Sequence, residues 1–189
     1  CFSADYRLAP EDTFPAAPND AFAGYKGLLE LGYAPEKIIL CGESAGATLV
    51  LDIPLMAKAA GIPNPAAVIA MSPVTDAIAV EEGTVLEGLD SSDQVLEVYA
   101  PGHDKADPLI SPALGDLTGF PPTFLSVGST EILLKDSLTF ARNAAKAGCD
   151  VRLHVGKDMI HTYPLDLWDY PEAMTAFEEM ELFLRQILR

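Results

Sequence analysis

The most informative stretch of this sequence is Lys37-Ile-Ile-Leu-Cys-Gly-Glu-Ser-Ala-Gly46, which joins an apolar run to a helical one through a glycine-flanked turn. Lys37–Cys41 is short, β-branched and apolar, as is typical of a buried strand, and Ala45–Ala60 predicts a helix. Gly42–Gly46, at the junction of the two, fits the pattern Gly-x-Ser-x-Gly, in which a strained strand-to-helix turn needs glycines two residues before and two residues after the serine. A glycine-rich turn that only caps a helix or binds an anion is the alternative. The flanking strand and helix favour a nucleophilic Ser44.

Short apolar runs and helix-length amphipathic runs alternate along the rest of the chain. We expect further strands at Cys1–Tyr6, Ala66–Met71, Thr123–Val127 and Asp150–Val155, and further helices at Asn19–Leu31, Lys135–Ala147 and Pro171–Leu188. This order predicts strand–helix–strand units that close on a parallel sheet. The predicted fold class is therefore α/β, with a mostly parallel sheet flanked by helices, and 189 residues suit a single domain.

The pattern weakens between residues 75 and 122, where acidic residues, glycines and prolines interrupt it. One helix is expected to begin there, at an N-cap of Ser91 or Ser92. An irregular stretch of this length between two strands is typical of an insertion with a function of its own. We therefore expect one domain over residues 1–189, with a cap-like insertion at about 75–110.

Composition and charge argue against several classes of function. With 12 Lys and Arg against 28 Asp and Glu, the net charge is −16 at pH 7, so the surface repels phosphate groups and anionic lipids. The richest apolar stretch, Ala47–Ile62, is interrupted by Asp52, Pro54 and Lys58 and is too broken to cross a bilayer. We expect no nucleic-acid partner and no membrane span.

Cys1, Cys41 and Cys149 are too few and too scattered for a disulfide framework or a Cys-x-x-Cys metal site. They favour a reducing compartment, and we expect a cytoplasmic protein. No metal and no cofactor is expected. The chain opens at Cys1 without a methionine, so we expect it to be part of a longer protein whose N-terminal segment lies upstream.

A nucleophilic serine needs a base, and a third group that orients the base. Of the three histidines, His103 lies in the irregular insertion, and His154 lies within an expected strand with no loop to free it. His161 follows the last strand, near the sheet edge at which ligands of open parallel sheets bind. We expect His161 to be the general base, and a surface histidine is the alternative.

The orienting carboxylate should follow a strand and precede the histidine in the chain. Glu131 meets both conditions, because it lies shortly after Val127. Asp136 is its rival, although its place in the first turn of the next helix suits a stabilising role. We favour Glu131, held against the imidazole of His161.

With these residues in place, the chain resembles the hormone-sensitive-lipase-like family of α/β-hydrolase carboxylesterases. The matching blocks run in order along nearly the whole chain: Asp5-Tyr-Arg-Leu-Ala-Pro-Glu11, Gly42–Gly46, Asp107-Pro-Leu-Ile-Ser-Pro112, Val127–Asp136 and Asp158-Met-Ile-His161. The resemblance implies a serine carboxylesterase that acts on short-chain, small-molecule esters. It would use Ser44, His161 and Glu131, form an acyl-enzyme, and hold the oxyanion partly with the Ala45 N–H. It also implies a possible homodimer.

Two alternatives remain beside this interpretation. An amide or acetyl-ester hydrolase of the same fold is the nearer one. A catalytically inert fragment, or a homologue that only binds small molecules, is the alternative from a different class.

The chain also departs from the family pattern. Glu131 and Glu43 stand where the family usually has aspartate, and Ala47 replaces a glycine. Family members carry a His-Gly-Gly-Gly motif that supplies oxyanion N–H groups, whereas no Gly-Gly pair occurs in this chain. We therefore expect the first strands and the oxyanion loop to lie outside it. The Cys1–Tyr6 strand would then lack its partners, and the activity of this chain alone would be impaired.

Overall fold

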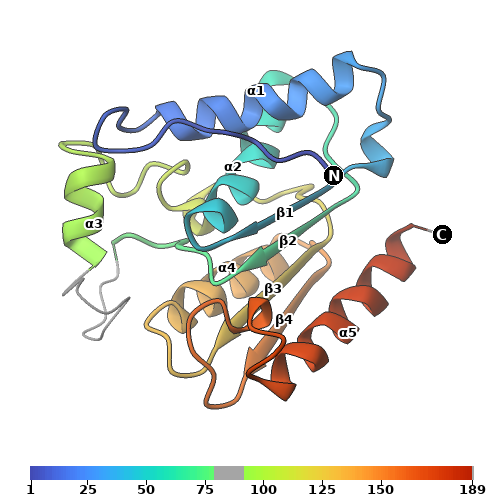
Figure 1. The fold of residues 1–189 in the computed structure, drawn as a ribbon. Helices are drawn as coiled ribbons and strands as arrows, with labels where there is room; N and C mark the ends of the chain where they lie inside the picture. Colours follow the sequence, from blue (N-terminus) through green and yellow to red (C-terminus); the bar gives the residue numbers. More distant parts are fainter. Residues whose placement is uncertain (79–91, 189) are drawn as a thin grey trace.

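The fold comes from a computed structural model, which describes residues 1–78 and 92–188. Within these residues the sheet has the strand order β1-β2-β3-β4 (Figure 1). The strands are Ile39–Glu43 (β1), Ala67–Met71 (β2), Thr123–Gly128 (β3) and Val151–Gly156 (β4). Every neighbouring pair is parallel. The predicted α/β fold with a parallel, helix-flanked sheet is confirmed.

Helices cover both faces of the sheet (Figure 1). The helices are Ala16–Glu30 (α1), Ser44–Ala60 (α2), Ser92–Tyr99 (α3), Leu134–Lys146 (α4) and Pro171–Ile187 (α5). α2 and α4 pack on one face, with α1 outside α2, and α5 packs on the other. Short 3-10 turns lie at Pro35–Lys37, Pro112–Leu114 and Tyr163–Leu165.

Strand β2 shows why the central strands are apolar throughout. Successive side chains of a strand point to opposite faces. Val68 and Ala70 therefore join the core beneath α1, α2 and α4, whereas Ile69 and Met71 join the core beneath α5. A parallel strand covered on both faces needs apolar side chains at every position.

Strand β1 begins and ends two residues later than predicted, because its neighbours decide both ends. The 3-10 turn Pro35–Lys37 takes up the predicted start, and the Ile38 N–H donates to the Pro35 carbonyl over 3.1 Å. At the other end, Gly42 and Glu43 stay in register with β2, so the strand runs up to the turn.

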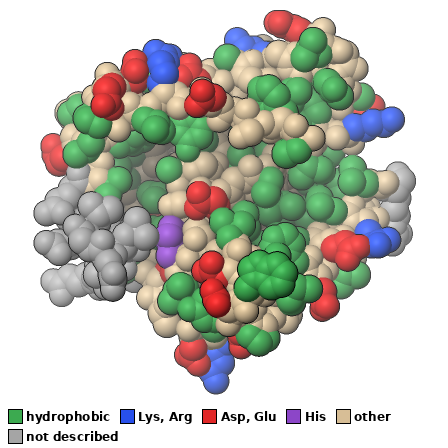
Figure 2. Space-filling model, in the orientation of Figure 1, with side chains coloured by type: hydrophobic (Ala, Val, Ile, Leu, Met, Phe, Trp, Pro, Cys, Tyr) green, Lys and Arg blue, Asp and Glu red, His purple; other side chains and the backbone are tan. Residues whose placement is uncertain are grey.

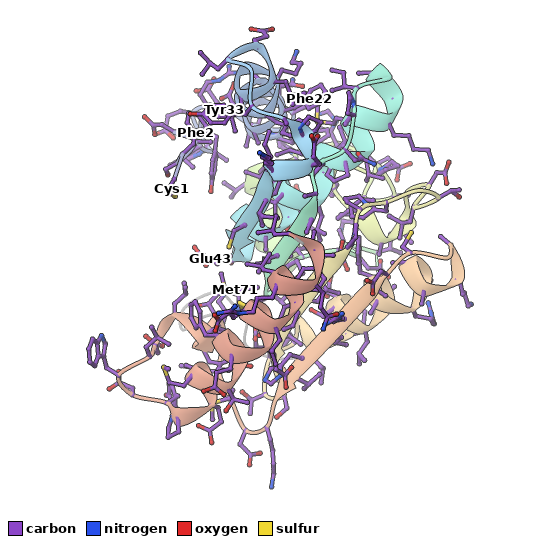
Figure 3. All side chains as sticks on the ribbon, turned by 90° about the vertical axis from the view of Figure 1, so that its right-hand side faces the viewer. Cys1, Phe2, Phe22, Tyr33, Glu43 and Met71 are labelled. Atoms are coloured by element: carbon purple, nitrogen blue, oxygen red, sulfur yellow. The ribbon has the colours of Figure 1, made fainter. Side chains whose placement is uncertain are left out.

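The strand predicted at Cys1–Tyr6 is wrong. Residues 1–8 adopt no regular secondary structure, because a strand exists only when a neighbour pairs with it, and none among the described residues does. This segment instead runs along α1: a Cβ built on Gly24 would lie 3.3 Å from the Phe2 ring. Figure 3 labels Cys1 and Phe2 on this exposed side of the molecule.

The region predicted as a cap-like insertion is described only in part. Residues 79–91, which include the predicted cap Ser91, lie outside the described residues, and α3 begins at Ser92. Residues on both sides of 79–91 form a small separate core with Phe14 from the N-terminal part of the chain; the other buried members are Ala77, Leu96, Ala100 and Ile110. One domain with a cap at about 75–110 stays a prediction.

Candidate active site

The loops that follow the strands meet at one edge of the sheet, because parallel strands all end on the same side. The polar residues brought there are Ser44 after β1, Ser72 after β2, Glu131 after β3 and His161 after β4. The last residues of β1 and β2, Glu43 and Met71, are register partners and are labelled in Figure 3.

Ser44 occupies a strained turn between β1 and α2. Its φ is 49°, in the left-handed region that non-glycine residues rarely adopt. A Cβ built on Gly42 would lie 2.3 Å from the Gly46 carbonyl oxygen, so only glycine lets the strand pass the helix here. A Cβ on Gly46 would meet no atom within 4 Å beyond its own helix among the described residues. The steric need predicted for both glycines therefore holds for Gly42 alone.

The structure brings Ser44, His161 and Glu131 into one hydrogen-bonded chain. Ser44 Oγ lies 2.9 Å from His161 Nε2, and His161 Nδ1 lies 2.5 Å from Glu131 Oε2. The serine and the histidine are 117 residues apart in sequence. The histidine and glutamate side chains are 15% and 3% exposed, so bulk water competes little for these contacts.

The positions of the protons in this series of hydrogen bonds follow from the chemistry of the three side chains. An ionised carboxylate only accepts hydrogen bonds, so His161 Nδ1 must carry a proton and donate the hydrogen bond to Glu131. In the neutral imidazole, Nε2 is then the acceptor, and it faces the Ser44 hydroxyl. The arrangement can take a proton from the serine oxygen and leave the resulting imidazolium next to a carboxylate.

Both oxygens of Glu131 have partners, and this fixes the orientation of the carboxylate. Oε1 accepts from the Gly128 N–H at 2.5 Å and from Ser72 Oγ at 2.8 Å. Oε2 is thereby left to His161. The loop after β3 thus folds back so that its own glutamate binds the end of its own strand.

The histidine loop packs directly on the glutamate loop. A Cβ built on Gly128 would lie 2.1 Å from the Met159 carbonyl oxygen, so a glycine is needed where the two loops touch. Thr130 Oγ1 donates to that same oxygen at 2.7 Å, and the Asp158 N–H donates to Ser129 Oγ at 2.7 Å. These contacts hold the loop that carries His161 at a fixed distance from Glu131.

The rival carboxylate lies elsewhere. Asp136 Oδ1 accepts the N–H groups of Thr75 and Asp76 at 2.7 and 2.8 Å, so this side chain ties the loop after β2 to the start of α4. Burial raises the pKa of Asp136, while the two N–H groups oppose that shift. Its contacts are those of a stabilising residue.

The two other histidines also lie apart from Ser44. His154, within β4, pairs through Nδ1 with Glu179 Oε2 of α5 at 2.8 Å. His103 stacks edge-on against Phe14, with 4.9 Å between the ring centroids. Neither ring is a partner of the serine.

Ser72 belongs to this edge of the sheet and was not singled out from the sequence. It is fully buried, has a φ of 53°, and contacts both the glutamate and the histidine loop. The available signal was its position: it is the first polar residue after the wholly apolar strand Ala67–Met71, at the edge where the other polar residues gather.

The start of α2 supplies one further group. Ala45 is the second residue of this helix, so its N–H has no carbonyl partner within the helix. The partial positive charge at a helix N-terminus favours an anion there. Figure 2 shows a histidine side chain at the molecular surface, with acidic and hydrophobic side chains nearby.

Within residues 1–78 and 92–188, no group of three or more His, Cys, Asp or Glu could hold a metal ion. In the same residues, no helix combines the length and the apolar character needed to cross a membrane.

Comparison with known proteins identifies the fold family. Residues 1–165 match a family described as the alpha/beta hydrolase fold. The chain belongs to the α/β-hydrolase family. This α/β-hydrolase chain is 36% identical to a hormone-sensitive lipase from a metagenome library, with a TM-score of 0.89 over 97% of this chain and 64% of that one. The predicted resemblance to hormone-sensitive-lipase-like members is confirmed.

Curated relatives carry names of the same kind. The α/β-hydrolase chain is 40% identical over 188 residues to an acetyl-hydrolase of Streptomyces hygroscopicus, covering 95% of this chain. It is 34% identical over 190 residues to an esterase of Acinetobacter venetianus, again covering 95% of this chain. The chain spans 62% of the length of each of these two relatives.

Proposed function

We propose that the protein hydrolyses carboxylic esters, with Ser44 as the nucleophile, His161 as the general base and Glu131 as the orienting acid. The observation that carries this proposal is the continuous chain of hydrogen bonds from Ser44 Oγ through the imidazole to the carboxylate. The membership of the α/β-hydrolase family and the names of its relatives give independent support.

In the first half of the reaction, Ser44 Oγ attacks the ester carbonyl carbon while its proton passes to His161 Nε2. The carbonyl π electrons move onto oxygen and give a tetrahedral oxyanion. Glu131 stabilises the imidazolium through the Nδ1 hydrogen bond. When the carbon–oxygen bond to the alcohol breaks, Nε2 returns the proton to the leaving alkoxide, and an acyl group remains on Ser44.

In the second half, water attacks the acyl carbon while His161 Nε2 takes its proton. Collapse of the second tetrahedral intermediate expels Ser44 Oγ, which recovers the proton from Nε2, and the carboxylic acid leaves. Each half returns His161 to the neutral tautomer that faces Ser44 at the start.

The Ala45 N–H is our candidate for one donor to the oxyanion. A single oxyanion donor contributes roughly a hundred- to a thousandfold in rate. Because the chain spans 62% of its relatives' length, the proposed activity is that of the whole protein.

For substrates we propose small esters with short acyl chains, and an acetyl group is the first to test because one relative is named an acetyl-hydrolase. The homodimer and the cytoplasmic location stay predictions.

The proposal is tested with a panel of p-nitrophenyl esters of increasing acyl length and the matching anilides, using the intact protein. Ser44→Ala should lower kcat roughly 10⁴- to 10⁶-fold. Ser137→Ala is the control, because Ser137 is a buried serine whose Oγ has no hydrogen-bond partner among the described residues. Ester hydrolysis that survives in Ser44→Ala would refute the mechanism.

The panel also separates the alternatives. Preference for the anilides would favour an amide hydrolase. Binding of an ester without turnover by the wild-type protein would favour a binding homologue. Mass spectrometry of the protein quenched during turnover should find the acyl group on the peptide that contains Ser44.

A further inference from the structure

Ser72 lies in the candidate active site, although none of the proposed catalytic residues follows the same strand. It comes directly after β2 and is fully buried. Its φ of 53° lies in the left-handed region, as do those of Ser44, Asp158 and Thr162 in the neighbouring loops. Backbone conformations of this kind gather at functional sites, where the surrounding contacts hold them in place.

The Ser72 side chain bridges two loops. Its hydroxyl donates to Glu131 Oε1 at 2.8 Å and accepts from the Thr162 N–H at 3.1 Å. Those partners lie 59 and 90 residues away in sequence. A hydroxyl suits this place because it donates and accepts at the same time.

The first of these contacts acts on the orientation of the carboxylate. Glu131 Oε1 receives two donors, Ser72 Oγ and the Gly128 N–H, so the carboxylate plane cannot turn without breaking one of them. Oε2 is held toward His161 Nδ1 as a result.

The second contact acts on the histidine loop. The Thr162 N–H belongs to the residue next to His161, and Thr162 itself has a φ of 54°. Ser72 is in turn anchored to the sheet, because its own N–H donates to the Ser126 carbonyl of β3 at 2.7 Å. The glutamate and the histidine loop are therefore both held to one fixed point at the end of β2.

We infer that Ser72 is a positioning residue for the hydrolytic reaction: its hydroxyl aligns Glu131 with His161 and holds the histidine loop beside Ser44. This inference rests on the proposed function. Because Ser72 acts through Glu131 and His161, its loss should slow the chemical step and leave substrate binding almost unchanged.

The test removes the hydroxyl without adding backbone strain. Glycine accepts a positive φ readily, so Ser72→Gly deletes the two hydrogen bonds and keeps the backbone conformation. Ser72→Cys is the second variant, which keeps the shape but donates and accepts only weakly. Ser126→Ala is the matched control, because Ser126 is an equally buried serine on the adjacent strand whose hydroxyl pairs with Tyr163 at 3.3 Å.

We expect Ser72→Gly, made in the intact protein, to lower kcat roughly 10- to 100-fold, the effect of one lost hydrogen bond to a charged group, with KM changed less than about twofold. Ser72→Cys should fall between Ser72→Gly and the wild type. Ser126→Ala should keep kcat within about twofold of the wild type.

A spectroscopic readout tests the same inference without activity. The His161 Nδ1–H bonded to a carboxylate should give a low-field proton NMR signal, assigned by its loss in His161→Ala. We expect this signal to move or broaden beyond detection in Ser72→Gly and to stay in place in Ser126→Ala.

The outcomes distinguish this inference from the proposed function. If Ser44→Ala abolishes hydrolysis while both Ser72 variants keep kcat and the low-field signal, the positioning role is overturned and the proposed function stands. If Ser72→Gly does not fold, Ser72→Cys decides by the same two measurements. Equal losses of kcat in Ser72→Gly and Ser126→Ala would also overturn the inference, because they would indicate general damage to the core. Hydrolysis that persists in Ser44→Ala refutes the proposed function itself, and the NMR signal still reports on the alignment.

Discussion

Replacing Asp52 by asparagine should stabilise the fold at neutral pH. Asp52 lies in α2 with no exposed surface, and neither of its carboxylate oxygens has a hydrogen-bond partner among the described residues. Burial, and secondly the nearby charge of Asp107, raises the pKa of Asp52 well above its usual range. The folded protein therefore holds this carboxyl group in the neutral form at a pH where the unfolded chain ionises it.

The magnitude follows from the linkage between protonation and folding. Below the pKa that the Asp52 carboxyl group has in the unfolded chain, about 3.9, this group is protonated in both the folded and the unfolded state. Asparagine resembles this neutral acid, so the substitution changes the stability little at such a pH. Above this pKa, only the unfolded chain releases the proton, and each pH unit lowers the stability of the wild type by about 1.4 kcal/mol. The total at pH 7 is at most about 4 kcal/mol. Asp52→Asn should therefore raise the free energy of unfolding by up to about 4 kcal/mol at pH 7 and by no more than about 0.5 kcal/mol at pH 4.

Urea unfolding of the intact protein at a series of pH values between 4 and 8 measures this difference. Asp116→Asn is the contrasting control, since Asp116 is exposed and the hydrogen bond from Lys58 lowers its pKa to about 2. A group with a lowered pKa stabilises the fold above its unfolded pKa, and this stabilisation is lost as the pH falls through its folded pKa. Asp116→Asn should therefore lower the free energy of unfolding at neutral pH, which is the opposite of the change expected for Asp52→Asn. The reasoning would be refuted if the difference in free energy of unfolding between Asp52→Asn and the wild type did not change with pH. It would also be refuted if the variant were less stable than the wild type at pH 7.

Two further substitutions test the candidate active site. Gly128→Ala should lower kcat at least tenfold, because its Cβ would lie 2.1 Å from the Met159 carbonyl oxygen and push the histidine loop away from Glu131. If this variant hydrolyses a p-nitrophenyl ester as fast as the wild type, the packing described is contradicted. His154→Asn should keep kcat within about twofold of wild type in the same assay, because His154 pairs with Glu179 of α5 and not with Ser44. A loss as large as that of Ser44→Ala would argue against His161 as the base.

The sequence was sufficient for the parts of the fold that depend on local pattern. The apolar runs that became β2 and β3 are buried on both faces, so composition alone identifies them. His161 and Glu131 could be placed because each follows a strand of a parallel sheet, and such residues gather at one edge. The prediction of a strand at Cys1–Tyr6 failed for the opposite reason. The segment has residues that suit a strand, but pairing with a neighbouring strand decides whether one forms.

Other features depend on contacts between distant residues. The role of Ser72 rests on two loops that lie 59 and 90 residues further along the chain, and no local pattern marks such a bridge. The Asp52 carboxylate, which has no hydrogen-bond partner among the described residues, appeared in the sequence only as a polar interruption of an apolar helix. Its burial could be known only once α2 was packed against the sheet and its neighbours.

The length of the side chain at position 131 constrains any redesign of this α/β-hydrolase chain. Glu131 reaches back to the Gly128 N–H with one oxygen while it meets His161 with the other. An aspartate would be shorter by one carbon–carbon bond, about 1.5 Å, and could not span both contacts from the same backbone position. The residue type and the loop path are therefore a matched pair, and grafting either one alone from a relative would break the connection.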